Sequence, residues 1–309
     1  MRRERLLLML GPVVLGAAAF VLTFHPSRPL YMRHRAVEIV SADGTVLAGT
    51  LSLPRWTRHP VAAVAMVHGS GRITRDQLVG DIRGLVRNGI GVLAYDKRGC
   101  GASGGVYPQG ADIGFENVLR LLTEDAEAVF ARLGREEGVD TSRLGFFGAS
   151  QASWIIPIAA GRLEPKPRFH VILSGAAVST GVENYYSQLT GDGTRPPQVE
   201  DPVAIRNQVA AYAGSPGFDP APTLMALRVP TLWLLGDLDQ SVPTFASVRV
   251  LESIRDAGNN SHTVVVYPEV DHGLRNVRTR RSAPIWHDMR AWLEGEGILC
   301  NGTYVPKRG

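Results

Sequence analysis

The sequence predicts a doubly wound, mostly parallel α/β sheet, and three observations carry that prediction. Short strand-like runs alternate with amphipathic helical runs along most of the chain. Most of these strand-like runs are apolar at every position, as strands covered on both faces are. The 309 residues, with 44% hydrophobic and 20% charged residues, are sufficient for one large core. Alternation of this kind places helices on both faces of a single sheet.

The first two strands differ from those that follow. Residues 35–40 and 46–51 flank a turn at Asp43-Gly44, a pattern typical of an antiparallel hairpin. The later strands are short continuous apolar runs, and the predicted helices lie between or after them. The predicted buried strands are 61–67, 91–95, 144–147, 171–173, 231–235 and 264–267, and the predicted helices are 75–87, 116–132, 151–162, 244–256 and 284–294.

One long segment interrupts this alternation. Between the strands at 171–173 and 231–235 the chain is rich in Gly, Pro and Tyr. This connection spans residues 174–230, and connections of more than about 15 residues are usually functional, for example as lids or inserted caps. We predict a cap at about residues 176–228, with a helical pattern at 203–212, and a disordered surface loop is the alternative.

The N-terminal segment reads as a targeting signal. Three arginines precede an apolar run over residues 6–24, and small residues at Ala17 and Ala19 fit cleavage after Ala19. An uncleaved membrane anchor fits the same run, and a buried helix is a third interpretation. We therefore predict a signal peptide or anchor at 1–24, a C-terminal tail at 297–309, and an extracytoplasmic body that is secreted or periplasmic if this segment is cleaved and attached to the membrane through it if not.

Charge and cysteine content exclude several classes of function. The chain has 33 basic and 29 acidic side chains, a net charge of 33 − 29 = +4, without the clustered basic stripe that nucleic-acid binding needs. Nucleic acid is therefore not an expected partner. Cys100 and Cys300 are too few for a four-ligand zinc site or a disulfide scaffold, so they form one disulfide or none. No metal is predicted.

The strongest chemical signal is Gly148-Ala149-Ser150-Gln151-Ala152, which lies between a buried strand and an apolar helix. A serine at such a junction sits on a sharp, strained turn, and small residues on either side let strand and helix pass closely. We predict that Ser150 is a catalytic nucleophile; the alternative is a serine that caps an ordinary helix.

A serine nucleophile needs a base and an orienting carboxylate. Asp237 and Asp239 follow the strand at 231–235, and Asp271 and His272 follow the strand at 264–267. Parallel strands bring their carboxyl ends to one edge, so these residues and Ser150 are expected to meet there. We assign His272 as the base and Asp239 as its acid, with Asp237 as the rival and Asp271 as structural.

The segment His68-Gly69-Ser70-Gly71 ends the strand at 61–67 and predicts an oxyanion hole. Its glycines let backbone N–H groups approach a substrate oxygen. We assign the two donors to the N–H groups of Gln151 and Ser70, with Gly69 as the alternative to Ser70. His68 is interpreted as supporting this loop rather than as the catalytic base.

Residues 99–104 spell G-x-G-x-x-G, the pattern of a dinucleotide-binding turn. Their context differs from such a turn, because residues 96–98 separate them from the strand and residues 106–110 follow where a helix should begin. We therefore predict a glycine-rich turn near the site, and no cofactor.

Together these motifs resemble the α/β-hydrolase superfamily, in particular the bacterial serine hydrolases related to esterases, lysophospholipases and prolyl-type aminopeptidases. The resemblance runs from about residue 34 to 296. It is carried, in family order, by the motifs at 68–71, 95–99, 148–151, 236–243 and 271–273. The resemblance implies an α/β-hydrolase fold, supports Asp239 over Asp237, implies no cofactor, and implies that an acyl chain is bound under the cap.

We accordingly predict hydrolysis of a small-molecule carboxylic ester through an acyl-enzyme. Cleavage of amides or peptides by the same residues is one alternative, and it needs acidic residues that recognise an amine. Glu183, Glu200 and Asp201 in the cap are the candidates. The other alternative is a non-catalytic binding protein with a hydrolase fold.

Overall fold

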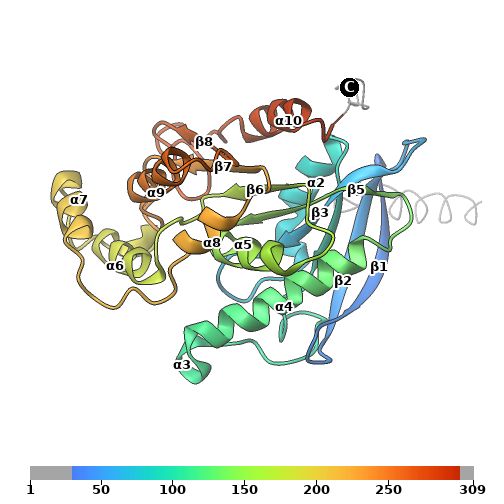
Figure 1. Ribbon diagram of the computed structural model, residues 1–309, viewed down its shortest axis with the longest axis horizontal. Helices are drawn as coiled ribbons and strands as arrows, with labels where there is room; N and C mark the ends of the chain where they lie inside the picture. The colour runs from blue at the N-terminus through green and yellow to red at the C-terminus, as the bar shows by residue number, and fades with distance from the viewer. Residues whose placement is uncertain (1–29, 300–309) are drawn as a thin grey trace, which may run out of the picture.

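A computed structural model describes residues 30–299, which fold around one sheet of eight strands (Figure 1). The spatial order of the strands is β1-β2-β4-β3-β5-β6-β7-β8. Their bounds are β1 Met32–Val40, β2 Val46–Pro54, β3 Val61–Val67, β4 Gly91–Tyr95, β5 Val139–Ala149, β6 Phe169–Leu173, β7 Thr231–Gly236 and β8 His262–Tyr267.

Pairing within the sheet confirms the predicted fold class. β1 and β2 form an antiparallel hairpin, and β2 pairs with β4 antiparallel. Every further pair, from β3–β4 to β7–β8, is parallel. The hairpin turn depends on Gly44, whose φ of 83° is a conformation that glycine adopts without steric cost.

Helices cover both faces of the sheet, because the strands are apolar on both sides. On one face α4 (Phe115–Leu133), α5 (Ala152–Arg162) and α9 (Thr244–Asp256) contribute to one core. On the other face α2 (Val79–Arg87) and α10 (Ile285–Gly295) pack into a second core, which also buries Ile298 and Leu299. The helix predicted at 75–87 begins with a 3-10 turn, η1 (Arg75–Leu78), and a short helix α3 (Gly110–Ile113) precedes α4.

The long connection between β6 and β7 contains α6 (Thr180–Thr190), η2 (Gly191–Gly193), α7 (Pro202–Ala210) and α8 (Ala221–Ala226). In Figure 1, α6 and α7 project beyond the sheet, drawn in yellow. Side chains of Ser179 and Asp201 cap the first turns of α6 and α7. Tyr186 and Leu189 of α6 pack with Val209 of α7, so this region has a small core of its own.

Three sequence predictions concern segments at the ends of the chain. Residues 1–24 and residues 300–309 lie outside the described residues, and Cys300 with them. Among residues 30–299 no helix is both long and apolar enough to cross a membrane. Cys100 is buried, and its thiol is free within the described part of the chain.

Candidate active site

Ser150 occupies the turn between the end of β5 and the start of α5. Its φ is 54°, an unusual conformation for a residue with a side chain, of the kind that costs about 1–3 kcal/mol. Two features hold the turn in place. The Ser150 N–H donates to the Leu173 carbonyl at 2.9 Å. Gly148 leaves room for the crossing helix, because a Cβ there would lie 2.5 Å from Cβ of Ala152 and 2.8 Å from the Val67 carbonyl oxygen.

His272 and Asp239 are joined by a hydrogen bond of 2.8 Å between Nδ1 and Oδ2. The Asp239 side chain is fully buried, and its Oδ1 accepts the N–H groups of Ser241 and Val242, each at 2.8 Å. Both carboxylate oxygens are thus used as acceptors, so Nδ1 of His272 donates its proton to Oδ2. Nε2 is then the basic nitrogen of the imidazole.

The rival carboxylates make other contacts. Asp237 Oδ1 accepts the Val270 N–H at 3.3 Å. Asp271 accepts the Arg275 N–H at 3.0 Å and pairs with Arg280 at 3.0 Å. Among residues 30–299 Asp239 is the one side chain that hydrogen-bonds the imidazole of His272. The geometry therefore favours Asp239 over Asp237 and agrees with a structural role for Asp271.

Backbone contacts at β6 connect Ser150 with His272. Leu173 accepts the Ser150 N–H, and the next residue, Ser174, donates its hydroxyl to the His272 carbonyl at 2.8 Å. No hydrogen bond joins Oγ of Ser150 to the imidazole within the described residues. Catalytic hydrogen bonds often reach full alignment only in the substrate complex, so the arrangement is compatible with proton transfer between the two.

The environment of His272 raises the pKa of its imidazole. Burial, the largest single influence, lowers the pKa, but the hydrogen bond and charge of Asp239 together with the charges of Asp192 and Glu183 outweigh it. The net pKa lies above the ordinary value of 6.5. The protonated imidazole is thus stabilised, as a base that must carry a transient positive charge requires.

The predicted oxyanion donors lie beside Ser150. Ser70 and Gln151 both line the same pocket as the serine, whereas Gly69 is not among the lining residues. No hydrogen bond within residues 30–299 uses the N–H of Ser70 or of Gln151. These two N–H groups are therefore available to a substrate oxygen, and the pocket lining favours Ser70 over Gly69.

His68 is unsuited to act as the base. Its ring is 2% exposed, Nε2 contacts the Tyr95 carbonyl oxygen at 2.7 Å, and the ring packs edge-on against Tyr95. Burial, together with the charge of Lys97, lowers its pKa to about 3. His68 is therefore neutral at physiological pH and supports the end of β3, as the sequence predicts.

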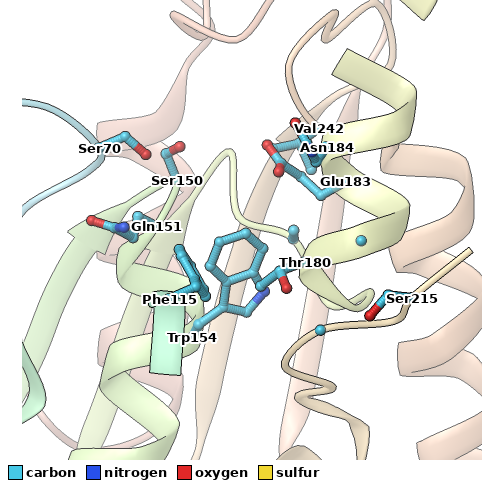
Figure 2. Close-up of a pocket in the computed structure, with 13 residues that line it drawn as sticks. Ser70, Phe115, Ser150, Gln151, Trp154, Thr180, Glu183, Asn184, Ser215 and Val242 are labelled. Carbon is cyan, nitrogen blue, oxygen red and sulfur yellow. The ribbon is translucent and has the colours of Figure 1, made fainter. Parts of the chain in front are cut away.

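A pocket of about 370 Å³ opens in front of Ser150 (Figure 2). Phe115 and Trp154 form an apolar wall, with their ring centroids 5.7 Å apart and nearly perpendicular. Glu183, on α6, faces Ser70 and Ser150 across the pocket. Burial, with a contribution from Asp192, raises the pKa of Glu183 to about 7. Of the three acidic candidates in the cap, Glu183 alone lines this pocket; Glu200 and Asp201 do not.

Residues 99–104 form a closed turn, as predicted. The Gly99 N–H donates to the Gly104 carbonyl at 2.8 Å, and Asp96 accepts the Ala102 N–H at 2.9 Å. The next helix, α3, begins only at Gly110. Such a turn has no helix N-terminus to hold a pyrophosphate. In the described part of the chain, no group of acidic, histidine and cysteine side chains has the arrangement of a metal site.

Comparison with known proteins identifies a matching family and a shared fold. The sequence profile of the prolyl oligopeptidase family matches residues 82–296. No curated protein sequence matches the chain.

Several solved structures share the fold. TT1662 from Thermus thermophilus is 20% identical, with a TM-score of 0.58, over 87% of this chain and 100% of that one. The esterase Pf2001 from Pyrococcus furiosus is 19% identical, with a TM-score of 0.59, over 86% and 92%. A hyperthermophilic esterase from Pyrobaculum calidifontis is 16% identical, with a TM-score of 0.61, over 86% and 87%.

Proposed function

The chain belongs to the prolyl oligopeptidase family of α/β-hydrolase serine hydrolases, and on that basis we propose that it cleaves carboxylic esters through Ser150, His272 and Asp239. The observation that carries the proposal is the buried Asp239 carboxylate bonded to His272 at 2.8 Å, at the sheet edge where Ser150 occupies a strained turn. This is the arrangement that nucleophilic catalysis by serine requires.

The proposed reaction has two halves. Nε2 of His272 removes the Ser150 proton as Oγ attacks the ester carbonyl, and the N–H groups of Ser70 and Gln151 hold the oxyanion. The imidazolium then protonates the leaving alcohol, and an acyl-enzyme remains. In the second half His272 activates water, which releases the acid and restores the serine. Asp239 holds the imidazole in the required tautomer throughout.

Two features support an ester rather than another substrate. The wall of Phe115 and Trp154 offers apolar surface to an acyl group, and two of the proteins that share the fold are esterases. The region at about residues 176–228 contributes Thr180 and Glu183 to the pocket, which supports its proposed role as a cap.

Replacement of Ser150 by Ala tests the proposal. We expect turnover of p-nitrophenyl esters to fall by at least about 10⁴-fold, because the nucleophile is removed. Ser142→Ala, in the same strand but with its hydroxyl bonded to Asp140, is the matched control and should keep full activity. Undiminished turnover by the Ser150 variant would refute the mechanism.

The alternative hypothesis, a non-catalytic binding protein, is tested with a fluorophosphonate probe. It predicts that the probe leaves Ser150 unlabelled, whereas an active enzyme should be labelled stoichiometrically.

A second candidate function is cleavage of amides or esters that carry an amine. The observation that favours it is the Glu183 carboxylate, which faces Ser150 across the pocket and has no salt bridge within residues 30–299. Aminoacyl p-nitroanilides and their N-acetylated forms separate the two functions. If the free amine matters, the N-acetylated substrates react more slowly and Glu183→Gln removes the difference. Equal rates for the free and N-acetylated substrates would contradict amine recognition by Glu183 and favour ester cleavage without it.

A further proposal concerns the cellular location of the protein. We propose that residues 1–24 direct the body out of the cytoplasm and that the body associates with the membrane, if at all, through this segment alone. Fractionation of cells that express the full chain tests this, because activity found entirely in the cytoplasm would contradict it.

A further inference from the structure

Lys97 is a buried ammonium for which the mechanism above has no role. It follows β4 and is 1% exposed. Among residues 30–299 no carboxylate lies within salt-bridge distance of its Nζ. Burial of a cation without a counter-charge costs free energy unless hydrogen bonds compensate. The contacts that compensate here all lead to the oxyanion hole.

Nζ of Lys97 donates three hydrogen bonds. Its acceptors are the carbonyl oxygen of Gly69 at 2.7 Å, that of Gly71 at 3.2 Å, and Oε1 of Gln151 at 3.3 Å. The first two flank Ser70, and the third belongs to the other predicted donor residue. Figure 2 shows the amide of Gln151 directed away from α6, on the side opposite Glu183. One ammonium therefore connects the loop after β3 with the turn after β5.

The Gly69 carbonyl and the Ser70 N–H belong to the same peptide group. A trans peptide is planar, with its C=O and N–H pointing in opposite directions. When the ammonium fixes the carbonyl on one side, the N–H is fixed on the other, and Ser70 lines the pocket in front of Ser150. A charge-assisted bond to the carbonyl also polarises the peptide and makes its N–H a stronger donor.

We propose that Lys97 is a positioning residue for the oxyanion hole: it orients the Gly69–Ser70 peptide, strengthens the Ser70 N–H as a donor, and holds it at a fixed position relative to Gln151. This inference rests on the proposed function. It concerns the transition state, because the full negative charge on the substrate oxygen develops only there.

The groups around the ammonium indicate when it is charged. His68 is neutral, Asp125 is already paired with Arg98 at 2.6 Å, and the ring of Tyr107 lies 5.8 Å from Nζ. Burial lowers the pKa of Lys97 to about 8, although Cys100 and Asp125 act to raise it. Lys97 is thus mostly protonated at neutral pH and loses its charge in mildly alkaline solution.

Lys97→Met, which keeps an unbranched side chain one atom shorter and removes the charge, is the direct test. We expect kcat for a p-nitrophenyl ester to fall about 10- to 100-fold, less than the loss of a direct oxyanion donor, while KM changes little. Affinity for a trifluoromethyl ketone, which forms a tetrahedral adduct, should fall by a similar factor. Lys166→Met, at an exposed ion pair with Glu164, is the matched control.

Three results would overturn the proposal: a kcat within twofold of the parent, a loss confined to KM, or unchanged affinity for the ketone. If Lys97→Met does not fold, the parent is compared with Lys97→Arg across about pH 7.5 to 9.5. The parent should lose kcat in this range and the arginine variant should not, because arginine stays charged. Equal profiles would also overturn it. Activity retained by Ser150→Ala would instead refute the proposed function itself, so the two failures are distinguishable.

Discussion

At the scale of the residue, both oxygens of the Asp239 carboxylate accept hydrogen bonds. Oδ1 is held by two backbone N–H groups and Oδ2 by His272. In Asp239→Asn an amide NH₂ group replaces one of these oxygens. If it takes the place of Oδ1, it faces the N–H groups of Ser241 and Val242; if it takes the place of Oδ2, Nδ1 of His272 must become an acceptor, which is the wrong tautomer for a base at Nε2. We expect kcat for ester hydrolysis to fall about 10⁴-fold. Asp237→Asn, at a carboxylate that accepts the Val270 N–H, should stay within a few-fold of the parent, and the reverse order would reassign the acid.

Activity should depend on pH through the same histidine. The imidazole acts as a base only when neutral, and its pKa in the folded protein is raised above 6.5. The rate of ester hydrolysis should therefore be half-maximal at a pH above 6.5 and fall further on acidification. Because the Glu183 carboxylate contributes to raising this pKa, Glu183→Gln should move the acid limb to lower pH. A rate independent of pH from about 5 to 8 would contradict the role of His272.

The sequence could predict the residues that are fixed by strand ends, and not those that depend on packing. Ser150 and Asp239 follow buried apolar strands and His272 follows the apolar edge strand β8, so their convergence at one edge follows from the parallel sheet. Lys97 also follows a buried strand, but the sequence does not show that its ammonium contacts Gly69 and Gly71 in one loop and Gln151 in another. Glu183 is visible only as one of several acids in the cap, and the folded cap singles it out.

At the scale of the element, the crossing of β5, the serine turn and α5 allows a specific test. A methyl group at position 148 would meet Cβ of Ala152 at 2.5 Å and the Val67 carbonyl at 2.8 Å. We expect Gly148→Ala to lower the free energy of unfolding by about 1–3 kcal/mol and to displace Ser150, with a matching loss of activity.

Gly161→Ala is the control for this substitution. Gly161 lies in the last turn of α5, where a Cβ meets nothing within 4 Å. Alanine there should be neutral or stabilise by up to about 1 kcal/mol, since it favours the helix. Urea unfolding of both variants measures the difference. If Gly148→Ala is as stable and active as the parent, the close crossing of β5 and α5 does not require glycine at position 148.

The sequence predicted best those elements whose own residues are apolar at every position. β3, β4 and β7 are buried at every position, as their sequences predict. α6 was expected only as part of an irregular cap, because its sequence, TGVENYYSQLT, lacks strong helix formers at most positions. It is stabilised by contacts with other elements, including the packing of Tyr186 against Phe245 of α9, which no local pattern indicates.

At the scale of the whole molecule, buried neutral histidines set the response to acid. Burial lowers the pKa of both His68 and His170 to about 3, well below the ordinary value of 6.5. The unfolded chain therefore binds protons that the folded chain does not, and stability is lost as pH falls from 6.5 toward 3. Burial also lowers the pKa of His262, which acts in the same direction, whereas the raised pKa values of His272 and Glu183 act in the opposite direction.

The urea midpoint measured from about pH 7 to 4 checks this expectation. It should fall with acidification, and the fall should be shallower in His170→Leu, which removes one of these buried protonation sites and places an apolar side chain beside Phe146. Arg135→Leu, at an exposed side chain, is the control that should leave the slope unchanged. A midpoint that is constant over this range would refute the assignment.

The α6 helix is fastened to the loop that carries the catalytic carboxylate. The Tyr186 hydroxyl donates to the Asp239 carbonyl at 2.5 Å, and the Thr190 hydroxyl donates to the neighbouring Gln240 carbonyl. The helix that lines the pocket and the loop that carries Asp239 are therefore joined directly. If Asp239 orients the base as proposed, remodelling this helix for a bulkier substrate should alter turnover along with selectivity.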